Sequence, residues 1–409
     1  MGKITKKLRI GLVLSAVPGY SETFFRSKIK FLQEEGVDIK LFVDQGQKEF
    51  DLCRVVEGFS NQGTKQQRLV KLLILVSRCL WSPLKLAKLW QLNKRDGFAL
   101  KENLLSLISS VHILGHSLDW LHFGFATISV NRENVARVIG AKMAVSIRGY
   151  DINVYPLKYP RAYSHLWNRI NKLHYIGDGL LRRAIEIGFD VNLPHKKITP
   201  AVNVELFANF KVVHRSTESE KYNSKINFLT VARLNWIKGL DYTLEALKII
   251  KDAGVIFEYQ IIGDGQEYER LVFARHQLGL QNEVVFIGKL DPNEIKEKLA
   301  MTDLYLQYSI QEGFCNAVIE AQAMGCLCVV SDAEGLSENV IDKITGFIVE
   351  KRNPKLLAET ILNVLLMSVQ DKKRISKQAM DRVSKEFNLD IQKQQFIEFY
   401  NQINNDTLV

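Results

Sequence analysis

Apolar runs of strand length alternate with stretches of helical periodicity along both halves of the chain. Each strand-like run is followed by a short polar or glycine-containing turn, and then by apolar residues spaced three or four positions apart. This alternation is typical of a parallel sheet covered by helices. The strand-like runs of the first half are LRIGLVLSAV, DIKLFV, DWLHFGF and KMAVSIRG, and those of the second half are INFLTVARL, FEYQIIGDG, VVFIGKL, LYLQYS and CLCVVSD.

Helical patterns connect these runs and divide the chain into two predicted α/β domains, each doubly wound. The clearest helices cover residues 22–35 and 240–253, and a glycine follows each of them, as is common at a helix end. We expect an N-terminal domain at 1–205, a C-terminal domain at 206–372 and a polar linker at about 211–225, which lacks periodicity. The segment 373–409 is helical in pattern and is expected to pack back on the first domain.

Composition and charge add a difference between the halves. A chain of 409 residues, 46% of them hydrophobic, is long enough to bury two cores. Residues 1–205 hold 31 Lys and Arg against 17 Asp and Glu, whereas residues 206–409 hold 24 against 28. The five cysteines are scattered without paired spacings or nearby histidines, which favours free thiols in a reducing cytoplasm and predicts no metal site.

The most basic stretch, residues 65–95, is also rich in leucine and tryptophan. It holds eight Lys and Arg and no acidic residue, with Trp81 and Trp90 on either side of Pro83. This composition is typical of a surface that lies on anionic lipid headgroups. The alternatives are ordinary core-facing helices with solvated lysines and, less favoured because no nucleic-acid-binding motif is present, a nucleic-acid patch. No apolar run reaches the roughly 18 residues of a membrane span, so we expect a peripheral or soluble protein.

Candidate chemistry begins with two carboxylates in the stretch EGFCNAVIEAQAMG, residues 312–325. Glu312 and Glu320 are eight positions apart, so a helix of 100° per residue brings them within about 80° of each other. If Glu312 precedes the helix and Glu320 lies two turns inside it, both can face one cleft. The alternative is a surface helix that carries two acids.

Cations and tight turns follow several of the strand-like runs. Arg233 and Lys238 come after INFLTVARL, and Gly239 allows a close approach, so this junction could bind a diphosphate. The turn at 263–265 ends the next run, and Lys289 and Leu290 follow the third, where exposed backbone could bind the edge of a base. Because ligands of open α/β sheets bind at the carboxyl ends of strands, these positions are candidates for one site. Solvated cations and a simple connecting turn are the alternatives.

Taken together, the motifs of residues 226–360 resemble the donor-binding domain of the family 4 glycosyltransferases. The resemblance implies a retaining enzyme of the GT-B fold that uses a nucleotide-sugar donor. It implies that Glu312 lies near the transferred sugar, that Glu320 accepts hydrogen bonds from the ribose, and that Arg233 and Lys238 stabilise the leaving diphosphate. The other donor-binding positions that it implies are Gly265, Lys289, Leu290, Gly313, Phe314, Cys315 and Asn316.

The first half resembles the branch of this family that builds bacterial surface polysaccharides. The resemblance implies that the backbone at Gly19 approaches the diphosphate, and that Arg148 and Asp151 of RGYD bind the donor and the acceptor hydroxyls, respectively. Many members have a histidine where Arg148 stands, and an arginine cannot act as a base. His122 is the nearest titratable substitute, although a lone histidine after a strand is more often a packed residue.

These observations predict a GT-B glycosyltransferase that moves a hexose from a UDP- or GDP-sugar, with retention, to a lipid-linked oligosaccharide. We expect it to act at the cytoplasmic face of the membrane without nucleic acid or any cofactor, and the absence of an Asp-x-Asp sequence favours metal-independent transfer. The alternative, prompted by Arg148, is a catalytically silent subunit that binds nucleotide sugar or membrane and assists a partner enzyme. A GT-B epimerase or phosphorylase is disfavoured by the order of the motifs.

Overall fold

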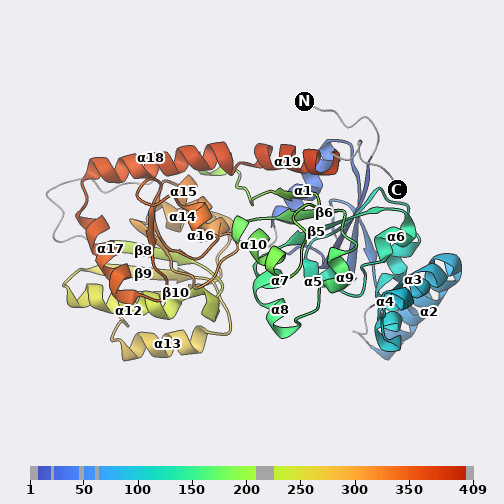
Figure 1. Ribbon diagram of the computed structural model, residues 1–409. Helices are drawn as coiled ribbons and strands as arrows, with labels where there is room; N and C mark the ends of the chain where they lie inside the picture. The colour runs from blue at the N-terminus through green and yellow to red at the C-terminus, as the bar shows by residue number, and fades with distance from the viewer. Residues whose placement is uncertain (1–7, 20–22, 46–49, 60–63, 209–224, 402–409) are drawn as a thin grey trace. The chain divides into compact units, whose positions relative to one another are not determined.

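The computed structural model describes residues 8–19, 23–45, 50–59, 64–208 and 225–401 (Figure 1). The chain forms two compact units. The first contains residues 1–198 and 393–409, and the second contains residues 199–392. The division therefore falls at 198/199, slightly before the expected 205/206, and the expected linker at 211–225 lies almost wholly outside the described residues. The C-terminal segment is shared, because the second unit includes it up to Gln392 and the first unit from Lys393 onward.

The first unit is built on a seven-stranded parallel sheet in the order β3-β2-β1-β4-β5-β6-β7. The interior strand β1 carries the buried run Ile10 to Leu14, as expected for a parallel strand covered on both faces. The strands are β1 Arg9–Ala16, β2 Asp38–Gln45, β3 Arg54–Glu57, β4 Trp120–Phe123, β5 Lys142–Ile147, β6 Lys172–Tyr175 and β7 His195–Lys197.

Helices of the first unit pack on this sheet, and one of them comes from the end of the chain. Apolar residues of β1 and α1 form one core with Phe396, Phe399 and Tyr400 of α19. The helices are α1 Thr23–Glu34, α2 Lys65–Trp81, α3 Pro83–Arg95, α4 Leu100–Leu114, α5 Ala126–Ser129, α6 Val135–Ile139, α7 Gly149–Asn153, α8 Tyr155–Lys158, α9 Ser164–Trp167, α10 Asp178–Glu186 and α19 Leu389–Asn401.

The second unit is built on a six-stranded parallel sheet in the order β10-β9-β8-β11-β12-β13. Its strands are β8 Ile226–Val231, β9 Phe257–Ile262, β10 Val284–Gly288, β11 Leu304–Gln307, β12 Leu327–Ser331 and β13 Phe347–Val349. Its helices are α11 Glu205–Ala208, the 3-10 turn η3 Trp236–Lys238, α12 Leu240–Asp252, α13 Tyr268–Gln277, α14 Pro292–Ala300, α15 Asn316–Ala323, α16 Leu336–Asn339, α17 Pro354–Leu366 and α18 Val369–Glu386.

The two parallel-sheet units confirm the predicted α/β architecture. Cys326 and Cys328 are buried around β12, in agreement with the expectation of buried thiols. The strands that the hydrophobic pattern did not indicate are the short strands β3, β6, β7 and β13, and three of them, β3, β7 and β13, lie at the edges of their sheets. Within the part of the chain that the structure describes, no helix is long and apolar enough to span a bilayer.

Candidate functional site

The second sheet has one point at which its strand order changes direction. The chain goes from β8 outward through β9 and β10, and then returns to the other side of β8 with β11, β12 and β13. The loops that follow β8 and β11 therefore lie side by side at the carboxyl ends of neighbouring strands. This is the position at which open α/β sheets bind ligands. Arg233 and Lys238 follow β8, and Glu312 follows β11.

An ion pair joins these two loops. The Nζ atom of Lys238 donates to Oε2 of Glu312 at 2.5 Å, and each side chain is only 15% exposed. The Ser309 hydroxyl donates to the same carboxylate oxygen at 3.2 Å. Burial lowers the pKa of the Lys238 ammonium, but the charge and hydrogen bond of Glu312 outweigh it, so the net shift is upward. Lys238 is therefore charged at neutral pH.

The backbone at Gly239 fixes how closely the two loops approach. Gly239 has φ of +61°, and a Cβ atom there would lie 2.2 Å from the carbonyl oxygen of Tyr308, which follows β11. The Ile310 N–H also donates to the carbonyl of Ile237 at 2.7 Å. Only glycine fits this conformation and this contact, and it places Lys238 beside the loop that carries Glu312.

Arg233 adds a second cation to the same place. Its side chain is exposed, and no described residue forms an ion pair or a side-chain hydrogen bond with it. The positive charge of Arg233 lowers the pKa of the Lys238 ammonium, because the two like charges repel each other. Two cations at this junction, one of them without a carboxylate partner, make a region that favours an anion.

Glu320 lies on α15, which begins at Asn316. Glu320 is thus the fifth residue of the helix, just over one turn inside it rather than the two turns expected from the sequence. Its side chain is half-buried, and burial raises the pKa of the carboxyl to about 7, although the charge of Lys296 acts in the opposite direction. No described side chain or backbone group donates a hydrogen bond to it. A partly desolvated carboxyl without donors is suited to accept hydrogen bonds from ligand hydroxyls.

Most of the residues between the two glutamates are buried and pack beneath the site. Phe314 is 7% exposed and packs edge-on against Phe387, and the Cys315 thiol is buried, which raises its pKa to about 12. The Cys315 N–H donates to Oδ1 of Asn339 at 2.9 Å. Gly313 is also buried, whereas Asn316 is half-buried at the start of α15. The side chains of Phe314 and Cys315 are therefore part of the packing beneath the site and are not exposed to a ligand.

Two further loops of this edge of the sheet are tied together. Asp264 and Lys289 form an exposed ion pair at 3.0 Å, and the Gly263 N–H donates to the carbonyl of Gly288 at 2.8 Å. Gly265 lies against the loop after β8, since a Cβ atom there would be 2.2 Å from the carbonyl oxygen of Leu234. Leu290 is half-buried beside Lys289. The loops after β8, β9 and β10 thus form one connected rim.

In the first unit, Arg148 and Asp151 belong to the start of α7. The Asp151 carboxylate is 1% exposed and accepts from the Arg148 N–H at 3.1 Å and from the Thr127 N–H and hydroxyl at 3.3 and 3.0 Å. Burial raises the pKa of Asp151 to about 6. The Arg148 guanidinium lies over the Phe24 ring, 3.7 Å from its centre. This geometry gives Asp151 a structural role at the start of α7. Gly19, the other candidate of this unit, lies in the loop after β1.

His122 lies inside the first unit and fits the packed alternative. It is 0% exposed on β4, and burial, followed by the charge of Lys28, holds its pKa well below the usual range. Its Nδ1 atom lies 2.5 Å from the Tyr400 hydroxyl and 3.3 Å from Lys28 Nζ, and its Nε2 atom lies 2.8 Å from the Ser146 hydroxyl. Both ring nitrogens are engaged, so this geometry does not present His122 as a base to a ligand.

The structure also brings in residues that the sequence did not indicate. Ser309 contacts Glu312, and Asn339 contacts the backbone of Cys315. His122 is surrounded by Lys28, Ser146 and Tyr400. No local pattern marks them, because each contact joins residues from separate elements. Among the described residues, no three His, Cys, Asp or Glu side chains gather as metal ligands would.

Comparisons with known proteins relate the chain to glycosyltransferases. Residues 215–382 match the family described as "Glycosyl transferases group 1". The chain is 25% identical over 405 residues to a putative colanic acid biosynthesis glycosyltransferase, WcaL, of Escherichia coli, covering 93% of this chain and 96% of the relative. It is 28% identical over 294 residues to the amylovoran biosynthesis glycosyltransferase AmsK of Erwinia amylovora, covering 68% of each chain.

Solved structures show the same fold. The crystal structure of Anabaena Alr3699/HepE in complex with UDP and glucose superposes with a TM-score of 0.70 at 18% identity, covering 96% of this chain and 98% of the other. The apo form of the lipopolysaccharide outer core galactosyltransferase WaaB superposes with a TM-score of 0.65 at 15% identity, covering 96% of this chain and 99% of the other. These matches support the resemblance drawn from the motifs: residues 215–382 match a glycosyl transferase domain, and the chain shares the fold of solved GT-B glycosyltransferases.

Proposed function

We propose that this chain transfers a hexose from a UDP- or GDP-sugar to a lipid-linked oligosaccharide during the synthesis of a bacterial surface polysaccharide. The observation that carries the proposal is the Lys238–Glu312 pair at the change of strand order, with Arg233 beside it. The names of the relatives WcaL and AmsK, and the UDP bound by HepE, support the class of product and of donor.

The roles of the charged residues follow from what each can bind. Arg233 and Lys238 receive the diphosphate, and their charges stabilise it as the bond to the sugar breaks. Glu320 accepts hydrogen bonds from the ribose hydroxyls. When the diphosphate engages Lys238, it competes with Glu312 for the ammonium, and Glu312 becomes available to the transferred sugar. The pair in the unliganded protein therefore keeps both groups charged and in place.

In this proposal the transfer proceeds with retention and without a protein base. The acceptor hydroxyl attacks the anomeric carbon on the face from which the diphosphate departs. The bond from that carbon to the phosphate oxygen breaks, the bond to the acceptor oxygen forms, and the hydroxyl proton passes to the departing β-phosphate oxygen. The products are the glycoside and free nucleoside diphosphate. This route is consistent with the buried and fully engaged ring of His122. We expect no cofactor and no metal ion to be required, since the cations come from the chain.

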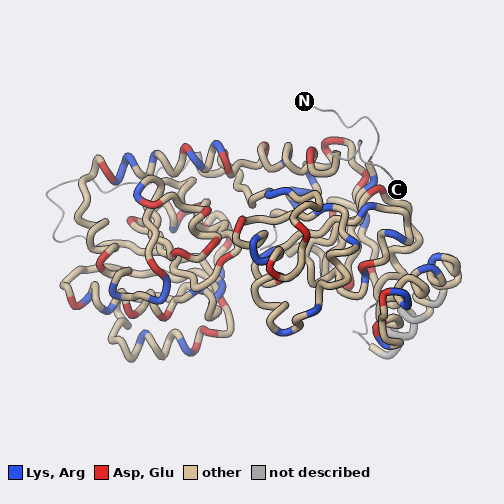
Figure 2. The backbone as a smooth tube through the Cα atoms, viewed as in Figure 1, with Lys and Arg blue, Asp and Glu red and all other residues tan. Residues whose placement is uncertain are grey.

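The acceptor is assigned to the first unit, which carries most of the positive charge of the chain. We propose that residues 65–95 place this unit on the anionic inner face of the cell membrane, where a lipid-linked acceptor is found. Within this stretch the side chains of Lys88, Lys94 and Arg95 are exposed, and Figure 2 shows the basic positions of α3.

The proposal is tested first by ligand binding and then by transfer. A panel of nucleotide sugars is screened by thermal unfolding, because a ligand at 100 times its Kd stabilises the folded state by about 2.7 kcal/mol. The expected result is stabilisation by one UDP- or GDP-sugar, followed by release of the free nucleotide in the presence of a membrane extract, with no loss of activity in EDTA. Binding without any transfer would favour the silent-subunit alternative. Stabilisation by none of the nucleotide sugars would contradict the assignment of the site.

A further inference from the structure

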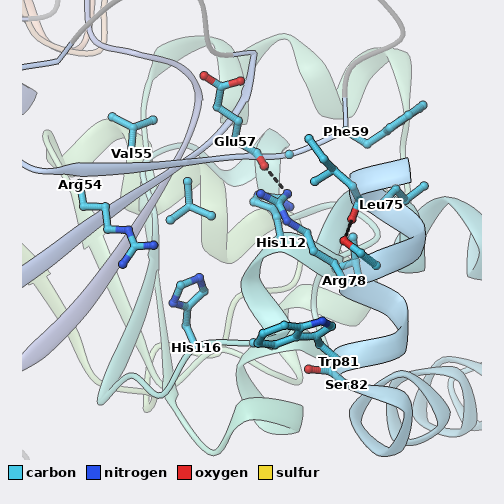
Figure 3. Close-up of a pocket in the computed structure, with 16 residues that line it drawn as sticks. Arg54, Val55, Glu57, Phe59, Leu75, Arg78, Trp81, Ser82, His112 and His116 are labelled. Atoms are coloured by element: carbon cyan, nitrogen blue, oxygen red, sulfur yellow. Dashed lines mark hydrogen bonds between the residues drawn. The ribbon is translucent and has the colours of Figure 1, made fainter. Parts of the chain in front are cut away.

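A cavity lies in the first unit, between the edge strand β3 and the C-terminal ends of α2 and α4. It has a volume of about 610 Å³ (Figure 3). Cavities of about 300–1,000 Å³ are typical of sites for small molecules. None of its lining residues belongs to the donor site described above. The cavity therefore needs an explanation of its own.

A buried imidazole lines this cavity without a hydrogen-bond partner. His112 on α4 is 2% exposed, and neither of its ring nitrogens is hydrogen-bonded. Burial, followed by the charges of Arg132 and Arg78, lowers the pKa of His112 to about 3, so the ring is neutral and carries one N–H donor. Buried polar groups are nearly always hydrogen-bonded, and an unpartnered one is costly. An occupant with acceptor oxygens would satisfy that donor.

The surroundings of the cavity are strongly positive. His116, which also lines it, has its pKa lowered to about 4 by burial and then by the charges of Lys40, Arg54, Arg78 and Lys85. Four cations thus act on one ring. Two of these cations lie next to each other, because Lys40 on β2 is opposite Arg54 on the neighbouring parallel strand β3.

These cations are poorly neutralised by the rest of the unit. Arg54 is exposed, and within the described ranges no carboxylate pairs with it. Arg78 donates to the backbone carbonyl of Glu57 at 2.6 Å, and Figure 3 shows the Glu57 carboxylate turned away from Arg78. Lys85 likewise donates to a backbone oxygen, that of Leu114, at 2.7 Å. Glu57 is the one acidic side chain in the lining, so the cavity has an excess of positive charge.

An apolar surface adjoins the cavity. Ile74 and Trp81 line it and are also 44% and 88% exposed, and their seven-residue spacing places them on one face of α2. Leu73 and Leu80 repeat this spacing and are 62% and 75% exposed, and Leu84 at the start of α3 is 84% exposed. Exposed apolar groups of this kind beside cations are typical of a surface that lies in a lipid interface.

We propose that this cavity binds the phosphate group of a membrane lipid while the exposed residues of α2 and α3 lie against its acyl chains. Arg54 and Arg78 supply the charge, and the imidazoles of His112 and His116 supply N–H donors. The lipid is favoured over a protein partner because one occupant of this chemistry matches both the cationic cavity and the apolar surface beside it. The inference rests on the membrane attachment proposed above, but it does not depend on sugar transfer.

The test compares two exposed arginines. Arg54 lines the cavity, whereas Arg95 lies at the end of α3 and does not, and both are exposed. The full chain and the variants R54Q and R95Q are sedimented with vesicles of phosphatidylcholine, with and without phosphatidic acid. Losing one general surface charge should weaken binding to the anionic vesicles about five-fold in R95Q. Losing a charge that also donates to the phosphate should weaken it on the order of fifty-fold in R54Q. Equal losses in both variants would overturn the proposal.

Two controls identify the occupant. R54Q should keep the thermal unfolding and the nucleotide binding of the parent chain, so a failure of the lipid site is distinguishable from a failure of the donor site. Leu80→Ser, at an apolar residue that is 75% exposed and does not line the cavity, should weaken vesicle binding but leave the binding of glycerol phosphate in solution unchanged. If glycerol phosphate alone binds as tightly as the anionic vesicles, the site serves a free phosphate and the lipid assignment is wrong. A dimer in the absence of lipid that Leu80→Ser dissociates would assign the apolar surface to a second copy of the chain and overturn the proposal.

Discussion

The Lys238–Glu312 ion pair shows how two loops far apart in sequence produce one charged site. Each partner is mostly buried, and the pair satisfies both charges in the unliganded protein. Removing one partner of such a pair leaves the other desolvated and alone, which is costly. The residues are therefore tied to each other in stability and, in the proposed reaction, in function.

We expect Lys238→Ala to weaken UDP or GDP binding and to lower turnover by on the order of 10²-fold, because the ammonium acts chiefly on the charge that develops on the leaving diphosphate. Steady-state kinetics and calorimetric titration of the nucleotide measure the two effects. Lys248→Ala on α12, the helix that follows, is the matched control, since the Lys248 side chain is 38% exposed and, among the described residues, forms its ion pair with Asp252 four residues further on. Unchanged kinetics in Lys238→Ala would contradict the assignment of Lys238 to the diphosphate.

Substitution of the two glutamates should affect different steps, nucleotide binding for Glu320 and transfer for Glu312. Glu320→Gln should weaken the binding of the free nucleotide, because the amide oxygen is a weaker acceptor for the ribose hydroxyls than a carboxylate. Glu312→Gln should leave nucleotide binding nearly intact and lower transfer. Titration of UDP or GDP and a transfer assay on both variants separate these roles. If both substitutions changed nucleotide affinity equally, the division of roles would be rejected.

Glu320 also predicts a pH dependence. Its pKa is about 7 in the folded protein against an ordinary value of 4.5, so between these values the folded chain holds a proton that the unfolded chain has released. The free energy of unfolding should therefore fall as the pH rises through this window. Because ribose hydroxyls donate to the ionised form, nucleotide affinity should rise as the pH passes about 7. Glu320→Gln should flatten both trends, measured by denaturant unfolding and by nucleotide titration. A parent chain whose affinity is constant across this window would contradict the assignment.

At the scale of elements, the loop between β8 and α12 depends on a single glycine. Gly239→Ala forces a positive φ on a residue with a side chain and places its Cβ atom 2.2 Å from the Tyr308 carbonyl oxygen. The matched control is Gly279→Ala, whose φ of +65° is similar but whose Cβ atom would meet nothing within 4 Å. We expect the control to lower the free energy of unfolding by about 1 kcal/mol and Gly239→Ala to lower it by about 3 kcal/mol or more.

Denaturant unfolding measures this difference, and nucleotide titration measures its functional side. The displaced loop should also weaken nucleotide binding in Gly239→Ala, whereas the control should bind normally. Equal destabilisation by the two substitutions would mean that the contact with Tyr308 relaxes easily and does not fix the approach of the loops.

The strands and helices differ in how well the sequence predicts them. Long apolar runs such as β1 and β12 are recognisable because a parallel strand buried on both faces is apolar at nearly every position. The edge strand β7, with the sequence HKK, carries no such signal, since its pairing depends on Leu173 to Tyr175 of β6. The hydrophobic pattern places Lys238 and Glu312 each after a strand, and the sheet order puts these strands, β8 and β11, next to each other. The ion pair of Lys238 and Glu312 was not predictable, because it depends on how closely two loops 74 positions apart pack.

His122 illustrates the same limit for a candidate catalyst. Its position after an apolar run is compatible with a base at a strand end or with a packed residue. What fixes its environment is Ser146 on β5, Lys28 on α1 and Tyr400 on α19, three residues from separate parts of the chain. The cavity lined by His112 and His116 was likewise not predictable, since its walls come from β3, α2 and α4.

At the scale of the whole molecule, the first unit is assembled from both ends of the chain. Its core contains Phe396, Phe399 and Tyr400, which follow the whole second unit in sequence. The Trp120 indole N–H donates to the Tyr400 carbonyl at 3.3 Å, and Lys172 Nζ donates to the Phe399 carbonyl at 2.8 Å. The first unit can therefore complete its core only after the C-terminal helix has been synthesised.

This arrangement predicts that a change in the last helix affects the first unit and not the donor site. Phe399 is 0% exposed, and its ring packs against those of Trp120 and His122, 6.2 and 5.7 Å away. Phe399→Ala should lower the free energy of unfolding of the first unit by about 3–5 kcal/mol. Leu366→Ala, at a residue 78% exposed on α17, is the control and should stay within about 0.5 kcal/mol of the parent chain.

Thermal unfolding with and without nucleotide separates the units, because the ligand stabilises the unit that holds Lys238. In Phe399→Ala the transition that nucleotide raises should stay where it is while the other moves to lower temperature. A single transition that moves as a whole would show instead that the units unfold together, and that α19 couples the stability of the donor site to the first core.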